Sequence, residues 1–167
     1  MLRSALLLLL CCVLAGPAWA QLSRVEAPPR SEDLVEWTAR IVPGDDRGEA
    51  RYLLDIRVAE GWYLYGARSE AGIPLTVTFP RLPEGVSARG GLRETRTLRG
   101  VDEALGLPYE YHTGEARVSQ GLKVDRRAVG RHRISARVRF TVCNDRVCLA
   151  PATETLSATL AVSGQGG

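Results

Sequence analysis

The residues of this chain best suited to chemistry are Cys143 and Cys148, which lie near its C-terminal end in the segment FTVCNDRVCLAP. Four residues separate them. Two cysteines at this spacing can form a structural disulfide, act as a redox-active dithiol, or supply two ligands of a zinc site. The rest of the sequence decides how far each interpretation can be taken.

The structural and redox interpretations both stay open on the residues alone. A disulfide that closes so short a loop stabilises a fold by only about 2 kcal/mol, and a domain with a substantial core hardly needs it. An exchange-active disulfide must be reachable by another thiolate, which a surface loop allows. Arg139 and Arg146 favour a thiolate nearby, whereas Asp145 opposes it, so charge does not decide the matter.

A zinc site is a weaker interpretation. It needs three or four protein ligands, and the only histidines are His112 and His132, neither of which has ligand-like spacing to the cysteine pair. Haem attachment would need Cys-x-x-Cys-His, which is absent. We therefore expect no metal and no organic cofactor.

The N-terminus has the pattern of a cleaved signal peptide over residues 1–20. Arg3 precedes an apolar run over residues 6–14, and Ala-Trp-Ala ends the segment. Cys11 and Cys12 lie in this segment and would leave with it. No later stretch is apolar enough to cross a membrane, so we expect an exported protein that does not span the membrane after cleavage, in a compartment where disulfides persist.

The remaining chain is predicted to be one domain over residues 33–163, between a flexible leader at 21–32 and a loose tail at 164–167. Its composition is that of an ordinary globular protein, with 45% hydrophobic and 25% charged residues. The formal charge is +3, and the arginines are interleaved with acids. This pattern argues against nucleic acid as a partner.

Short alternating segments punctuated by turns, without helical periodicity, predict an all-β, antiparallel sandwich. The clearest strand is 131–142, which is followed after the cysteine loop by 154–162 as the second arm of a hairpin. By the same alternation Cys143 should point outward. Residues 100–114 are predicted to be a long loop. The other strand candidates are 34–42, 51–58, 62–65, 75–79, 92–98, 116–118 and 122–124.

Four motifs in order resemble one known family. They are EGWYLY at 60–65, LPEGV at 82–86, DEALG at 102–106 and CNDRVCLAP at 143–151. Each is weak by itself, but together they are specific. Over residues 34–162 the chain resembles the periplasmic N-terminal domain of the thiol:disulfide interchange protein DsbD, also called DsbD-alpha.

The resemblance implies an immunoglobulin-like sandwich that exchanges disulfides with thioredoxin-like proteins. It implies that Cys148 forms the mixed disulfides and Cys143 resolves them, with Tyr63 and Tyr65 lining the site. Because the chain ends soon after the sandwich, its partners are expected on separate chains: thioredoxin-like proteins and a DsbD- or CcdA-like membrane electron carrier. The resemblance also implies a cap loop over the sulfurs, made of Asp102, Glu103, Ala104, Leu105 and Gly106.

The cap departs from the family pattern, because Ala104 stands where well-studied members have a shielding aromatic residue. Tyr109 or Tyr111 could take over that role. Plainer interpretations also stand beside these: Tyr63 and Tyr65 could be packing residues, and Asp102 and Glu103 ordinary loop acids. Trp37 and Trp62 are expected in the core, and His112 in an exposed loop. The rival function is a non-catalytic exported sandwich, used for binding or assembly, with a structural disulfide.

Overall fold

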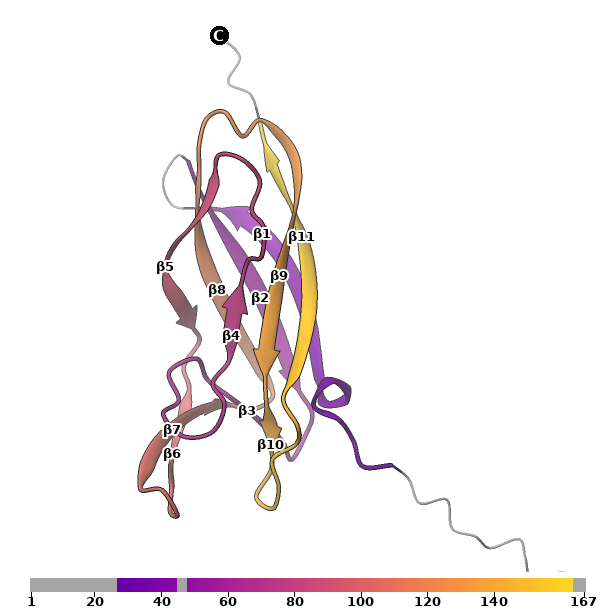
Figure 1. The fold of residues 1–167 in the computed structure, drawn as a ribbon, viewed down its shortest axis with the longest axis vertical. Helices are drawn as coiled ribbons and strands as arrows, with labels where there is room; N and C mark the ends of the chain where they lie inside the picture. The colour runs from indigo at the N-terminus through magenta and orange to yellow at the C-terminus, as the bar shows by residue number, and fades with distance from the viewer. Residues whose placement is uncertain (1–26, 45–47, 164–167) are drawn as a thin grey trace, which may run out of the picture.

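The fold was obtained as a computed structural model, which describes residues 27–44 and 48–163 (Figure 1). The predicted signal peptide and tail, and the first half of the predicted leader, lie outside these residues. The elements in chain order are η1 (Ser31–Leu34), β1 (Val35–Pro43), β2 (Glu49–Val58), β3 (Tyr63–Tyr65), β4 (Thr76–Thr78), β5 (Val86–Glu94), β6 (Leu98–Asp102), β7 (Leu107–His112), β8 (Glu115–Val124), β9 (Gly130–Phe140), β10 (Val142–Cys143) and β11 (Ala152–Val162).

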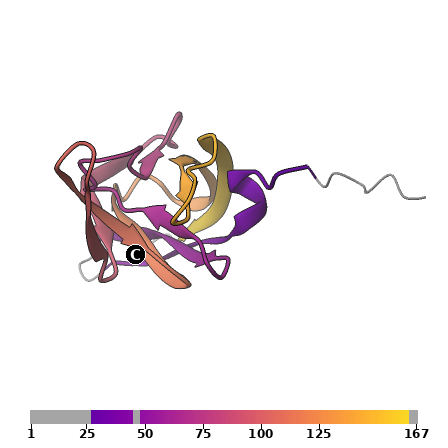
Figure 2. The ribbon, with the colours of Figure 1, turned by 90° about the horizontal axis from the view of Figure 1, so that it is seen from below.

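The strands form three antiparallel sheets, in the orders β1-β2-β8-β5, β11-β9-β4 and β10-β3-β7-β6. The first two sheets enclose the main core. The third sheet is small and lies at one end of the sandwich, beside the cysteine loop, and Figure 2 views the molecule from that end. The predicted all-β, immunoglobulin-like sandwich is confirmed, as is the pairing of β9 with β11 around the cysteine loop.

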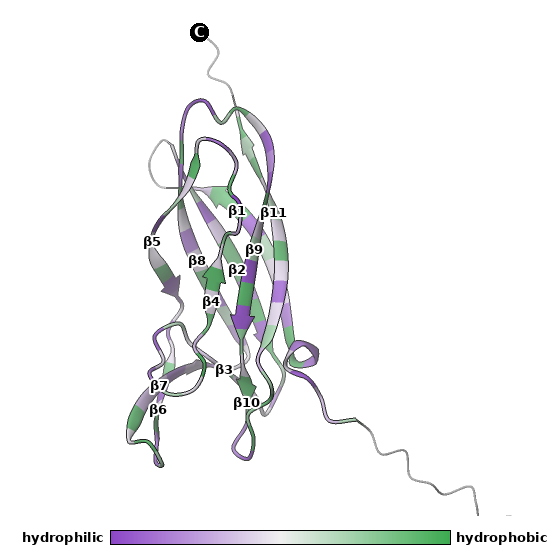
Figure 3. Cartoon of the chain, in the orientation of Figure 1, coloured by the Kyte–Doolittle hydropathy of each residue, from purple (hydrophilic) through white to green (hydrophobic). Residues whose placement is uncertain are grey.

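The core follows from strict alternation along β9. Ile134, Ala136, Val138 and Phe140 are all fully buried, and the residues between them face outward. Figure 3 shows the same alternation as bands of hydrophobic and hydrophilic colour along the long strands. Trp37 of β1 packs edge-on against Phe140, with ring centroids 5.0 Å apart, which brings the two large sheets into contact.

A hydrogen bond also joins the two large sheets. The Tyr52 hydroxyl, from β2, donates to the Leu156 carbonyl of β11 at 2.8 Å, and Tyr52 is almost fully buried. Burial raises the pKa of Tyr52 to about 12, because the phenolate would lose its hydration there.

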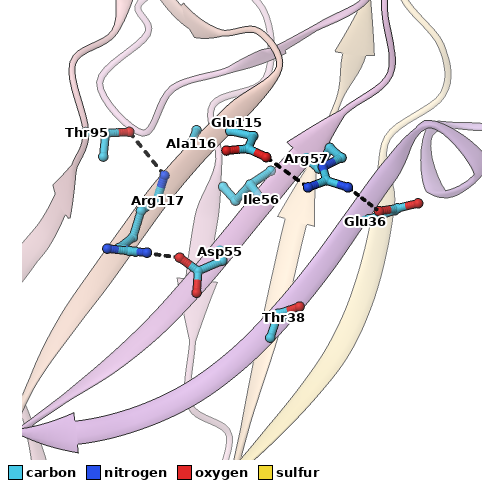
Figure 4. Close-up of a pocket in the computed structure, with 9 residues that line it drawn as sticks. All are labelled: Glu36, Thr38, Asp55, Ile56, Arg57, Thr95, Glu115, Ala116 and Arg117. Atoms are coloured by element: carbon cyan, nitrogen blue, oxygen red, sulfur yellow. Dashed lines mark hydrogen bonds and ion pairs between the residues drawn. The ribbon is translucent and has the colours of Figure 1, made fainter.

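The outer face of β1, β2 and β8 carries paired charges, drawn in Figure 4. Arg57 lies between Glu115, at 2.8 Å, and Glu36, at 3.8 Å. Asp55 likewise lies between Arg117 and Arg40. The hollow between these side chains has its charges satisfied across strands, so we interpret this face, called here the paired face, as structural.

The predicted long loop at 100–114 is wrong. This stretch contains β7 and the end of β6, which pair as a hairpin with Gly100 opposite Tyr109. Gly106 and Pro108, which suggested a loop, instead lie at the hairpin turn and beside it. The two short candidates at 116–118 and 122–124 are one continuous strand, β8.

Replacing Tyr52 by Phe tests the link between the two large sheets. The change leaves the Leu156 carbonyl without its donor, so we expect a loss of about 1–2 kcal/mol in the free energy of unfolding at neutral pH. Between pH 10 and 12 the unfolded wild-type chain releases the Tyr52 proton while the folded chain keeps it, so wild-type stability falls with rising pH. Urea unfolding across this range should show a shallower fall for the variant; an identical fall would contradict the assignment.

Candidate functional site

The cysteine loop begins where the chain leaves one sheet and joins another. After Phe140 the pairing with β11 ends, and Val142 and Cys143 pair instead with Leu64 and Tyr63 of β3. The chain then turns back so that Cys143 and Cys148 form a disulfide, with their Cα atoms 4.0 Å apart. The two cysteines are therefore held at the boundary between the core and the small sheet.

The turn between the cysteines is held by its own hydrogen bonds. The Asn144 side-chain oxygen accepts from the backbone N–H groups of Arg146 and Val147, both at 2.9 Å. The Asn144 N–H donates to the Val147 carbonyl at 2.9 Å, and the Leu149 N–H donates to the Val142 carbonyl at 3.0 Å. Asparagine suits this position because its short amide can bond the backbone two and three residues ahead.

The two sulfurs lie in different environments. Cys143 is 0% exposed, whereas Cys148 is exposed. The expectation that Cys143 points outward is therefore wrong. The alternation along the strand correctly placed Cys143 on the opposite face from Val142, outside the main core cluster. However, pairing with β3 places it beside Tyr63, so that face of the strand is covered instead of solvated.

Four tyrosines cover this face of the small sheet. Tyr63 and Tyr65 are two residues apart on β3, so their side chains lie on the same face of the sheet. Tyr63 pairs with Cys143, and Tyr65 pairs with Tyr111 of β7. Tyr109, two residues before Tyr111, lies on that face as well. Ring centroids lie 5.0 Å apart for Tyr63 and Tyr111, and 5.7 Å apart both for Tyr63 and Tyr65 and for Tyr65 and Tyr109. We call these four residues the tyrosine cluster.

The tyrosine cluster reaches the disulfide through Tyr65. Its hydroxyl lies 3.8 Å from Sγ of Cys148, within hydrogen-bonding distance for sulfur, and Tyr65 is itself buried. Burial and then the neighbouring Tyr65 raise the pKa of Tyr63, which therefore keeps its proton. Both predicted lining tyrosines therefore lie at the cysteine pair.

Two glycines give the rings room. A Cβ on Gly72 would overlap the ring of Tyr65, and a Cβ on Gly100 would overlap the ring of Tyr109. Gly72 also has φ of 73°, in the left-handed region that favours glycine. Sequence reasoning did not single out either glycine. Sequence reasoning also missed the pairing of β3 with β7, for which the shared Tyr-x-Tyr spacing at 63–65 and 109–111 is a signal in the sequence.

The predicted cap residues form the turn of the β6–β7 hairpin. Asp102 holds this turn by accepting from the N–H groups of Ala104 and Leu105, both at 3.0 Å. Residues 103–106 are exposed, and the structure gives them no hydrogen bond or ring contact with either cysteine among the described residues. The hairpin instead contributes Tyr109, from its strand, to the tyrosine cluster.

The expectation for His112 is wrong: it is not in an exposed loop but buried in β7. Its Nε2 lies 3.0 Å from Oε1 of Glu94, at the end of β5, and both side chains are 1% exposed. The same carboxylate oxygen accepts from the Ala67 N–H at 2.9 Å. His112 pairs with Leu64, and both side chains lie on the face of the small sheet opposite the tyrosine cluster. The contact between His112 and Glu94 therefore holds that face against the end of β5.

A groove opens beside the exposed sulfur. It is lined by Cys148 and the residues that follow it to Glu154 on one side, and by Pro28, Pro29, Arg30 and Glu32 on the other. The Ser31 hydroxyl joins the two walls by donating to the Ala150 carbonyl at 2.7 Å. Cys143 does not line this groove, so only one end of the disulfide is open to it.

The described residues contain no group of three or more His, Cys, Asp or Glu side chains that could hold a metal ion. His132 contacts the Ala128 carbonyl at 3.2 Å. Within the same residues, no helix has the length and apolar character needed to cross a membrane.

The family model for the N-terminal part of the thiol:disulfide interchange protein DsbD matches residues 32–160. The chain belongs to this family. The reduced N-terminal domain of DsbD from Neisseria meningitidis has a similar structure, with a TM-score of 0.52 and 19% identity, covering 83% of this chain and 91% of that one. This likeness shows a shared fold.

The N-terminal periplasmic domain of ScsB from Proteus mirabilis gives a TM-score of 0.49 at 18% identity, covering 74% of this chain and 44% of that chain. No curated protein matches. Family membership and the Cys143–Cys148 disulfide together support thiol–disulfide exchange as the general chemistry of the chain.

Replacing Gly72 by Ala should displace Tyr65 from Cys148. We expect a loss of stability of about 2–4 kcal/mol, from left-handed strain and from overlap with a buried ring. Gly90→Ala is the matched control, because Gly90 has φ of 66° but open space around its Cα, so only the strain applies. Reduction by dithiothreitol, measured on folded protein, should be faster in Gly72→Ala alone; equal rates in both variants would show that Tyr65 does not shield the sulfur.

Replacing Glu94 by Ala should destabilise the small sheet. The change leaves the His112 ring nitrogen and the Ala67 N–H buried without a partner, so we expect a loss of at least about 2 kcal/mol. Glu94→Gln keeps an acceptor oxygen and should lose less. Urea unfolding with the disulfide intact measures both variants, and equal losses would mean that the hydrogen bonds are not what Glu94 contributes.

Proposed function

We propose that this chain is a periplasmic thiol–disulfide exchange protein that passes electrons between thioredoxin-like or membrane electron-carrier partners and downstream periplasmic oxidoreductases. Cys148 is the sulfur that partners attack, and Cys143 is its resolving partner. The observation that carries the proposal is the asymmetry of the disulfide: Cys148 is an exposed residue, whereas Cys143 is 0% exposed.

The exposure of Cys148 supports the following order of steps. A partner thiolate attacks Sγ of Cys148, a new S–S bond forms, and the bond to Cys143 breaks, leaving Cys143 with the electron pair as a thiolate that takes up a proton. The partner's second thiolate then attacks the partner sulfur of this mixed disulfide and releases Cys148 as a thiolate. The partner leaves as a disulfide, and this chain has gained two electrons.

The groove supports attack at Cys148. Thiolate attack on a disulfide proceeds from behind the sulfur that is attacked, in line with the bond that breaks. The groove between residues 28–32 and 148–154 is lined by Cys148 but not by Cys143, so it offers space for this approach. An approach to Cys143 would have to pass through the tyrosine cluster.

Tyr65 would assist the reverse direction. In the reduced chain, Cys148 must act as a thiolate toward a downstream disulfide. The Tyr65 hydroxyl, 3.8 Å away, can donate its O–H to that thiolate and stabilise it. Asp102, Glu103, Ala104, Leu105 and Gly106 would form a cap loop beside the cysteine pair, and Ala104 leaves its tip without an aromatic shield.

A non-catalytic sandwich with a structural disulfide is the rival function. The position of the disulfide argues against it, because the large sheets are already joined by the core and by the Tyr52 hydrogen bond. A reduction potential separates the two functions. Structural disulfides lie below about −300 mV, and a value in that range would favour the rival.

Single-cysteine variants test the assigned roles, in a background where Cys11 and Cys12 are serine. The probe is a thioredoxin whose attacking cysteine carries a thionitrobenzoate leaving group and whose resolving cysteine is removed. Cys143→Ala should form the mixed disulfide through Cys148 at least about tenfold faster than Cys148→Ala forms it through the buried Cys143. Release of thionitrobenzoate gives both rates.

The comparison holds only for folded variants, which near-UV circular dichroism checks. Equal rates in the two folded variants would contradict the assigned roles. A folded Cys143→Ala variant that forms no mixed disulfide would contradict exchange through Cys148 altogether.

A further inference from the structure

The outer face of the β11-β9-β4 sheet carries a row of arginines that the exchange chemistry does not use. Residues 131, 133, 135, 137 and 139 alternate outward along β9, and all except Ser135 are arginine. Their Cα atoms follow at about 7 Å per outward position, so the row is about 27 Å long. We call Arg131, Arg133, Arg137 and Arg139 the arginine stripe.

Nothing on this face neutralises the stripe. Its neighbours across the strands are threonines and small residues: Arg139 lies between Thr76 and Thr153, and Arg137 lies between Thr78 and Thr155. Within these three strands no Asp or Glu alternates onto this face. In the part of the chain that the structure describes, none of the four guanidinium groups has an ion pair or a hydrogen bond, and all four arginines are exposed.

The paired face of the other large sheet provides an internal comparison. There Arg57 and Arg117 each lie against a carboxylate from a neighbouring strand. Arg57 and Arg117 on one sheet are therefore compensated, whereas the arginine stripe on the other sheet is not. Because like charges on one strand repel at this spacing, an uncompensated row is unfavourable for the isolated chain and is relieved by an anionic partner.

The stripe is continuous with the site. Thr153, the cross-strand neighbour of Arg139, lines the groove into which Cys148 opens. The acids of that groove do not compensate the stripe. Glu32 pairs with Arg30 at 3.3 Å, and Glu154 alternates onto the opposite face of β11 from Thr153. A protein bound over the arginine stripe can therefore reach Cys148 while it stays in contact with the stripe.

We propose that the arginine stripe is the docking surface for an acidic face on the redox partner whose thiolate attacks Cys148. The inference rests on the proposed exchange function and adds the chemistry of the partner. Opposite charge along an approach surface raises the association rate, and the effect falls with ionic strength because salt screens exposed charges.

Two matched dithiol peptides serve as probes: one carries four glutamates beside a Cys-x-x-Cys segment, and the other carries four glutamines in their place. In 20 mM salt the acidic peptide should reduce the Cys143–Cys148 disulfide faster than the neutral peptide. In the Arg133→Gln/Arg137→Gln variant the rate with the acidic peptide should fall on the order of tenfold, with no change for the neutral peptide. The difference should shrink at 500 mM salt.

The control variant is Arg96→Gln/Arg126→Gln, which lowers the net charge equally by removing two exposed arginines that lie outside the stripe. It should change the rate with the acidic peptide less than twofold. If the rate with the acidic peptide falls equally in the two double variants, the effect is due to net charge and the proposal is overturned. A fall for both peptides in the stripe variant would overturn it too.

Binding of an acidic peptide without cysteines separates this inference from the exchange function. Calorimetry at low salt should detect binding to the wild-type protein that the stripe variant loses. If this binding is present but neither dithiol peptide reduces the disulfide, the stripe stands as an anionic docking surface and the exchange function fails. If the acidic peptide does not bind, or if the stripe variant loses binding only to vesicles of anionic phospholipid, the proposed partner is overturned.

Discussion

The transfer of one strand between two sheets determines the chemistry of this disulfide. Had β9 continued straight, Cys143 would have stayed on the outward face with the arginines, and both sulfurs would be open to any thiol. Pairing of β10 with β3 instead buries Cys143 beside Tyr63. The transfer of the strand from one sheet to the other lowers stability at Thr141, because its hydroxyl is buried without a hydrogen-bond partner in the described part of the chain. The result is a disulfide with one buried and one exposed sulfur.

The small sheet has to be rigid for this arrangement to persist, and it is fixed from both faces. On one face the rings of the tyrosine cluster contact one another, with Gly72 and Gly100 leaving room for Tyr65 and Tyr109. On the other face the buried contact between His112 and Glu94 ties β7 to the end of β5. Each interaction is modest alone, but both act on strands only three to six residues long, which could not hold their position by pairing alone.

Local patterns in the sequence were sufficient to predict the sandwich, the hairpin around the cysteines and the family. The alternation along 131–142 depends only on neighbouring residues, so it can be recognised without knowledge of the fold. It failed at Cys143, because the environment of that residue depends on β3, almost eighty residues earlier in the chain. The prediction for His112 was wrong for the same reason: its partner Glu94 lies on another strand, and no local sequence pattern indicates that the two side chains meet. The loop at 100–114 failed because Gly106 and Pro108 mark a hairpin turn as readily as a loop.

The absence of an aromatic residue at Ala104 changes how selectivity would have to arise. A lid that covers both sulfurs excludes wrong thiols by steric hindrance and must open for the right partner. Here Cys148 is exposed, and the hairpin contributes its aromatic ring from Tyr109, at the level of the strands. Under the proposed function, burial of Cys143 would limit attack to Cys148 from one groove. Discrimination among thiols that enter that groove would then depend on how often each arrives, and an uncompensated row of arginines ending beside the groove would favour acidic partners at the encounter step.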